Sequence, residues 1–200
     1  MTTGKKTVAE LMAELNSDPE YLARKKAQDE ARDKLRDELA RAQEPLVAAL
    51  GSAGVDVQTV WDLLNQKTLP VAAIPVLLEH VKKRNYPDEI REGMLRALAT
   101  PRARSHWDEL VGFFEHNTLS LPPERRYVAA LALHGAADDS VIEDVIRLVS
   151  DNTLGPDRAP LLLTLQRSTN PKAKMLLLNL RDDPGLGKEV KRLRRLKRNQ

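Results

Sequence analysis

The chain carries few residue patterns that could support acid–base, metal or nucleophilic chemistry. Its histidines form neither a His-x-x-x-His pair nor a His-Glu-x-x-His motif, and a zinc site requires at least three convergent ligands. They are His80, His106, His116 and His134. The absence of cysteine excludes disulfides, thiolate metal sites and a cysteine nucleophile. We therefore predict surface or partly buried histidines and no metal site.

Motifs for phosphate binding and for nucleophilic catalysis are also missing. The chain contains no Gly-x-Gly-x-x-Gly loop, no P-loop motif and no Gly-x-Ser-x-Gly turn. Two pairs of adjacent aspartates, at positions 138–139 and 182–183, fall in expected turns between helices. Helix capping explains them better there than acid–base catalysis does. The sequence predicts no catalytic residue, no cofactor and a protein that is not an enzyme.

An acidic segment is the first candidate binding feature. Residues 105–151 contain nine acidic and three basic side chains, although the whole chain has a net charge of +3. Such a block would attract a basic protein over a long range and speed its association. The predicted partner-binding residues are five of these carboxylates and one phenylalanine, expected to be a half-exposed apolar anchor. They are Asp108, Glu109, Phe113, Glu115, Glu143 and Asp144. The alternative is that the carboxylates only solvate their helices.

The basic end of the chain is the second candidate. Seven cations lie within residues 188–198, interleaved with the apolar positions Val190, Leu193 and Leu196. This spacing favours a helix that caps the core with a cationic outer face, and contact with a nucleic acid or another polyanion is the alternative. No aromatic residue is present to stack on a base. The cations are Lys188, Lys191, Arg192, Arg194, Arg195, Lys197 and Arg198.

Helices must position all of these residues. Residues 8–15 show one short amphipathic pattern, and residues 19–42 are highly charged with only a thin apolar side. We interpret residues 19–42 as an exposed helix rather than a coiled-coil arm, and we leave the oligomeric state open. Pro45 is expected to break the helix or to start another, which stops at Gly51–Gly54. Residues 1–54 thus form a predicted N-terminal cap.

From residue 55 to the end, the apolar positions recur with a period of about 35 residues. Val60 and Leu63 recur as Leu95 and Leu98, and later helices continue the shift. Such a period predicts stacked helix pairs, since one pair alone would leave an apolar stripe exposed. The stripe predicts a core that includes Leu110, Leu131 and Val145. For Trp61 and Trp107, core packing is favoured over a binding groove.

The helix pairs resemble HEAT repeats. Residues 87–98, 123–133 and 155–165 each contain a proline, then an arginine, then an Ala/Leu-rich run, and two second helices end in aspartate turns at 151 and 182–183. The resemblance implies an all-α, right-handed solenoid of HEAT-like pairs over residues 55–200, with the second helices lining the inner curve. Tetratricopeptide repeats have a similar length, but their Trp-Leu-Gly-Tyr pattern is missing. The whole layout is similar to small bacterial HEAT-repeat proteins.

The composition agrees with a helical protein. Aromatic residues make up only 4% of the chain and charged residues 30%, which disfavours a β-sandwich or barrel. No apolar run is long enough to span a bilayer, and the first residues lead into no apolar signal core. We therefore expect a cytoplasmic protein without a membrane partner.

Three functional classes remain open at this stage. The first is a scaffold that binds a basic protein through an acidic inner face, with an immunity- or antitoxin-like role as one version. The alternative is a nucleic-acid-binding protein that uses the basic C-terminal helix. HEAT-like alkylpurine DNA glycosylases use a basic concave face, from which this acidic centre departs. An enzyme of unknown type is the third and least favoured class.

Overall fold

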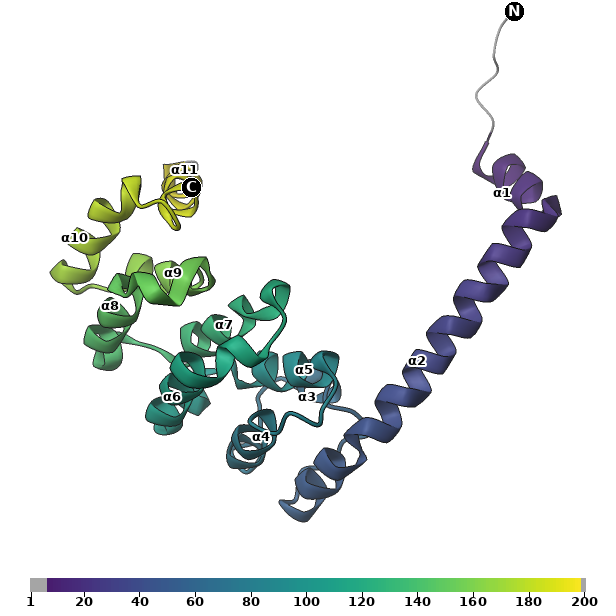
Figure 1. The fold of residues 1–200 in the computed structure, drawn as a ribbon, viewed down its shortest axis with the longest axis horizontal. Coiled ribbons are helices and arrows are strands. Elements are labelled where there is room, and N and C mark those ends of the chain that lie inside the picture. The colour runs from purple at the N-terminus through teal and green to yellow at the C-terminus, as the bar shows by residue number, and fades with distance from the viewer. Residues whose placement is uncertain (1–6, 199–200) are drawn as a thin grey trace, which may run out of the picture. The chain divides into compact units, whose positions relative to one another are not determined.

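The computed structural model describes residues 7–198, except for the side chains of residues 9–11, 13, 15 and 196–198. Every regular element in this range is a helix, and no strand occurs there (Figure 1). The predicted all-α class is therefore confirmed. Across the same residues, no helix combines the length and the apolar character that crossing a membrane requires. The chain divides into two compact units, residues 1–42 and residues 43–200.

The first unit contains α1 (Val8–Ser17) and most of α2 (Pro19–Ser52). Asp18 caps the start of α2, because its carboxylate accepts a hydrogen bond from the Glu20 amide at 2.9 Å. Exposed ion pairs three or four residues apart, such as Lys26–Glu30, run along the helix. Leu35 is 49% exposed. The helix predicted for residues 19–42 is therefore confirmed, and its side chains are largely exposed in this single chain.

The predicted break at Pro45 is wrong, because α2 continues through it to Ser52. Proline inside a helix removes one hydrogen bond and costs about 3 kcal/mol or more. Packing offsets this cost, since Leu46 and Leu50 are completely buried in the second unit. Gln43 is also buried, and its side-chain oxygen accepts a hydrogen bond from the Val60 amide at 2.9 Å. The boundary between the two compact units lies inside this helix, between residues 42 and 43, whereas the predicted cap spans residues 1–54.

The second unit holds the remaining helices, in which first and second helices alternate. The first helices are α3 (Asp62–Asn65), α5 (Asp88–Leu98), α7 (Tyr127–Ala136), α9 (Leu161–Arg167) and α11 (Gly187–Arg198). The second helices are α4 (Ala73–Val81), α6 (Trp107–Asn117), α8 (Ile142–Ser150) and α10 (Pro171–Asn179). Short 3-10 helices connect them: η1 (Pro101–His106), η2 (Thr118–Ser120), η3 (Pro123–Arg125), η4 (Asp139–Val141), η5 (Asn152–Arg158) and η6 (Leu180–Asp182).

The helices of the second unit pack in chain order (Figure 1). Each first helix contacts the next first helix from α3 to α9, and α5, α7 and α9 also pack on the second helix before them. Fully buried leucines such as Leu77, Leu98 and Leu133 fill the space between the helices. From α3 to α9, successive helices thus cover one another's apolar faces.

Three arginines make the same bond at successive positions in this packing. The Nε atoms of Arg91, Arg126 and Arg158 donate to the carbonyl oxygens of Val81, Leu121 and Val149, at 3.4, 3.1 and 2.9 Å. The Val81 and Val149 carbonyls lie at or near the ends of α4 and α8, where backbone oxygens lack helical partners, whereas Leu121 lies in the connection after η2. Arg91 therefore joins α5 to α4, and Arg158 joins η5 to α8, while the bond of Arg126 stays within the connection before α7.

The predicted core is confirmed at Leu110 and Val145, and Trp107 is also buried. Leu131 is only half-buried, because it shares the outer stripe of α7 with the exposed Tyr127, four residues earlier. Trp61 is 36% exposed. It lies just before α3, which begins the series of first helices. No preceding first helix therefore packs over Trp61.

Candidate interaction surface

The predicted acidic residues lie on α6 and α8, and two direct bonds join these helices. The indole Nε1 of the buried Trp107 donates to the Asp144 carboxylate at 3.0 Å. Near the other end of α6, the Arg147 guanidinium donates to Glu115 at 2.5 Å, and it also lies 3.8 Å from Asp144. The hydrogen bonds from Arg147 to Glu115 and Asp144 raise the pKa of that arginine. Arg147 thus brings Glu115 of α6 and Asp144 of α8 together around one guanidinium.

Two further carboxylates pair with lysines at α4 and α10, the second helices on either side of α6 and α8. Glu109 accepts a hydrogen bond from Lys82, which follows α4, at 3.4 Å, and another from His106 at 2.9 Å. These bonds, with the His106 bond the larger contribution, lower the pKa of Glu109. Glu143 accepts from Lys172 at the start of α10, at 2.9 Å. Pairs of oppositely charged side chains thus link consecutive second helices from α4 to α10.

Sequence analysis did not identify the cations in this set. Lys82, Arg147 and Lys172 lie 27, 32 and 29 residues from their partner carboxylates. These separations are all shorter than the apolar period of about 35 residues, so that period alone did not point to the pairs. Such pairs are a structural link between neighbouring helices, and they partly neutralise the acidic segment.

Asp108 differs from the other four carboxylates. It is exposed, and it forms neither an ion pair nor a side-chain hydrogen bond within the part of the chain that the structure describes. It lies in the first turn of α6, as Glu109 does, while Glu143 and Asp144 lie in the first turn of α8. A carboxylate in a first turn favours the helix because it complements the positive end of the dipole. All four thus support their helices locally.

The prediction that Phe113 is a half-exposed anchor is wrong, because its side chain is only 2% exposed. The buried face of α6 is wider than a single stripe: Trp107, Leu110, Val111 and Phe114 are buried together with Phe113. The helix packs against α7 and is bonded to α8, so neighbours cover more than one side. The acidic surface therefore contains no exposed phenylalanine.

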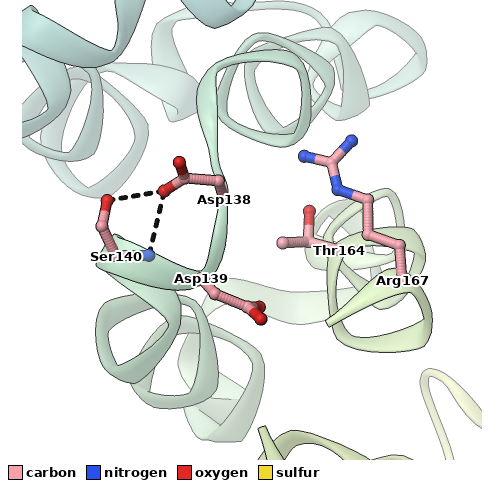
Figure 2. Close-up of a pocket in the computed structure, with 5 residues that line it drawn as sticks. All are labelled: Asp138, Asp139, Ser140, Thr164 and Arg167. Atoms are coloured by element: carbon pink, nitrogen blue, oxygen red, sulfur yellow. Dashed lines mark hydrogen bonds between the residues drawn. The ribbon is translucent and has the colours of Figure 1, made fainter. Parts of the chain in front are cut away.

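A pocket of about 410 Å³ lies between η4 and α9 (Figure 2). Asp138, Asp139 and Ser140 line one side, and Thr164 and Arg167 line the other. Figure 2 shows that the Asp138 carboxylate accepts hydrogen bonds from the Ser140 amide and hydroxyl, at 2.9 and 2.5 Å. Asp138 therefore caps η4, as the sequence predicts, and it also pairs with Arg104.

The other polar groups of this pocket are bound to the protein as well. Asp139 accepts from the Thr169 amide and hydroxyl at 3.0 and 2.5 Å, and hydrogen bonds from Ser168 and Thr169 lower its pKa to about 2. Arg167 donates to the carbonyl oxygens of His134 and Ala137. These bonds join successive helix pairs and leave no carboxylate of the pocket without a partner.

Histidine 134, next to this pocket, is not placed as a catalytic base for Ser140. Its Nδ1 lies 2.8 Å from the Thr164 hydroxyl oxygen. Burial, and to a lesser extent the charge of Arg167, lower the pKa of His134. The Ser140 hydroxyl donates to a carboxylate instead of to a histidine, so this geometry contains no activated nucleophile. Within residues 7–198, no group of three His, Asp or Glu side chains is arranged to hold a metal ion.

The basic helix α11 packs through Val190 and Leu193, which are 0% and 4% exposed. Lys191 pairs with Asp182 at 3.2 Å, and Arg192 pairs with Glu189 in its own helix. Three exposed cations form no ion pair with any described residue: Lys188, Arg194 and Arg195. The side chains of Lys197 and Arg198 lie outside the described set. The helix covers the end of the core, as its capping interpretation predicts.

Comparisons of the chain with protein-family models, with curated proteins and with solved structures found no match.

Proposed function

We propose that residues 43–200 form a HEAT-like, right-handed helical array that acts as a protein-binding scaffold and not as an enzyme. The ordered packing of first and second helices supports the array, and Arg91 and Arg158 each bond to a carbonyl at or near the end of the preceding second helix. The partner is a basic protein that docks on the acidic surface, defined by Asp108, Glu109, Glu115, Glu143 and Asp144.

The observation that carries this proposal is the exposure of carboxylates on two neighbouring helices. On α6 and α8 themselves, these five carboxylates face one cation, Arg147. Lys82 and Lys172 reach the surface from outside, and their side chains are 43% and 72% exposed. Exposed ion pairs contribute only about 0–1 kcal/mol. A cation of the binding partner can therefore replace either lysine at little cost, and Asp108 has no bond to lose among the described residues.

Binding of an oligo-lysine peptide tests this proposal. The Asp108→Lys/Glu143→Lys variant reverses one charge on each helix, and Asp56→Lys/Glu124→Lys is the matched control, because both of its carboxylates are exposed elsewhere in the second unit. We expect the first variant to weaken binding about tenfold and the control to weaken it much less. Equal loss in both variants would show that net charge alone attracts the peptide, which contradicts the proposal.

A nucleic-acid partner is the second candidate, favoured by the exposed and unpaired Lys188, Arg194 and Arg195 on the described part of α11. Each phosphate that these cations neutralise would make the affinity fall more steeply with salt. A gel-shift titration with duplex DNA at several salt concentrations measures that slope. A slope near zero, or one unchanged by Arg194→Glu/Arg195→Glu, would reject this candidate.

A further inference from the structure

A second pocket, of about 450 Å³, lies where the turn after α3 meets the end of α5. Its apolar lining includes Leu63 and Ala97, which are buried, and Leu64, which is 40% exposed. The volume falls within the range of about 300–1,000 Å³ that is usual for ligand pockets. The pocket shares no residue with the acidic surface, and its exposed leucine offers contact area to an apolar group.

The rim of this pocket is basic. Lys67 and Arg102 line it and are exposed, and neither forms an ion pair within the described residues. Arg96 also lines it and is held by hydrogen bonds to Glu92 at 2.7 Å and to the Tyr127 hydroxyl at 3.2 Å. None of the described lining residues is acidic. Two free cations and one fixed cation therefore surround an apolar floor.

Close packing holds α5 against the segment before α3, beside the pocket. Gly93, one turn before Ala97 on α5, lies so near the segment before α3 that a Cβ there would be 2.6 Å from Val60 Cγ1. Such close packing leaves little room for the walls to shift. A pocket that already has its shape binds with a smaller ordering cost than one that must form on contact.

We propose that this pocket docks a segment of another protein that carries an apolar side chain flanked by carboxylates. The apolar side chain would fill the floor at Leu63, Leu64 and Ala97, and the carboxylates would pair with Lys67 and Arg102. Arginine is enriched among the residues that carry most of the binding energy of protein interfaces. A basic segment would face like charges here, and such a contact is unfavourable.

The test uses a fluorescein-labelled, amidated peptide of alternating glutamate and leucine, measured by fluorescence anisotropy. Its comparison peptides replace every leucine by serine or every glutamate by lysine. The Lys67→Glu/Arg102→Glu variant reverses the free rim charges, and Leu64→Ser reduces the apolar floor. Arg181→Glu/Lys188→Glu is the matched control, because both residues are exposed cations with no ion pair among the described residues.

We expect the glutamate–leucine peptide to bind the native chain about tenfold more tightly than the Lys67→Glu/Arg102→Glu variant. Leu64→Ser should weaken binding several-fold, and the control should leave it nearly unchanged. The serine peptide should bind more weakly than the leucine peptide, because it lacks the apolar anchor. The lysine peptide should not bind at the pocket.

Four results would overturn the proposal. The first is no binding to the native chain, and the second is equal binding of the leucine and serine peptides. The third is a single-stranded DNA of equal charge that binds as tightly and depends equally on Lys67 and Arg102, which would assign the pocket to nucleic acid. The fourth is a dimer in sedimentation experiments that Lys67→Glu/Arg102→Glu abolishes, which would assign it to a second copy of the chain.

Discussion

The acidic surface on α6 and α8 and the basic pocket between α3 and α5 differ in how their charges are used. The acidic surface carries more charged groups, yet four of its five carboxylates bond to other side chains of the protein. The pocket has fewer charges, but Lys67 and Arg102 have no ion-pair partner among the described residues. The number of charges in a segment therefore does not show how many of them are available to a partner.

Helix packing explains the difference. Packed helices bring opposite charges that lie 27 to 32 residues apart into contact, so these charges pair within the molecule. Lys82 and Glu109, and Lys172 and Glu143, meet in this way. The pocket lies at the first helices of the array, where fewer preceding helices are present to supply partners. We expect stability to depend on the paired charges and binding to depend on the unpaired ones.

The largest expected effect concerns a cation that is fully used inside the protein. Arg91 is 3% exposed and donates to the Ser120 carbonyl and hydroxyl oxygens at 3.0 and 2.5 Å. Two such charged hydrogen bonds together contribute about 3–5 kcal/mol, so Arg91→Ala should lower the free energy of unfolding by about that amount. Urea denaturation measures it. Lys67→Ala, an exposed control, should change it by less than about 0.5 kcal/mol.

A smaller effect separates two carboxylates of the acidic surface. Asp144→Ala leaves the indole N–H of the buried Trp107 without its partner, which costs about 1–3 kcal/mol. Asp108→Ala removes a carboxylate from the same position in a helix, the first turn, but breaks no bond. Its cost should be only the dipole contribution, about 0.3–1 kcal/mol. Equal losses of stability in the two variants would contradict the distinction between carboxylates that bond within the protein and carboxylates that are free to bind a partner.

The exposed ion pairs between helices should contribute even less to the free energy of unfolding. A double-mutant cycle with Lys82→Ala and Glu109→Ala should give a coupling energy of about 0.2–1 kcal/mol, typical of exposed pairs. High salt should reduce the coupling further, because screening weakens exposed pairs. A coupling well above this range would mean that the pair is structurally essential and that no partner cation could replace Lys82.

The smallest expected effect is a pH dependence at Asp139. Hydrogen bonds from Ser168 and Thr169 lower its pKa from 3.8 to about 2. A carboxylate whose folded-state pKa is lowered stabilises the protein above its unfolded pKa, and this contribution disappears as the pH falls through the folded pKa. Asp139→Asn should therefore flatten the loss of stability between pH 3.8 and about 2. Thr169→Val should flatten it only in part, and melting curves across this window would measure both effects.

The sequence predicted the helical class and much of the core because apolar spacing records which side of a helix is covered. Leu110 and Val145 follow the recurring stripe and are buried. The number of neighbouring helices determines how much of the surface of a helix is buried. The spacing of apolar residues along one helix does not record that number. This explains why Phe113 is buried and Leu131 is not.

For the candidate site, the sequence predicted which helices carry the carboxylates but not which cations neutralise them. Asp138 and Asp183 were recognisable as capping residues because capping is local, and both accept hydrogen bonds from backbone amides close after them. The pairing of Glu115 with Arg147 depends on the register between two helices. Pro45 shows the same limit, since long-range packing of Leu46 and Leu50 outweighs a local helix breaker.

A crossed titration tests most directly whether the chain is a scaffold with two separate docking surfaces. The oligo-lysine peptide and the glutamate–leucine peptide are titrated separately into the native chain, the Asp108→Lys/Glu143→Lys variant and the Lys67→Glu/Arg102→Glu variant. Each reversal should weaken its own peptide about tenfold and change the other peptide only slightly. If each reversal changed both peptides to the same extent, net charge would govern binding, and the account of two local surfaces would be contradicted.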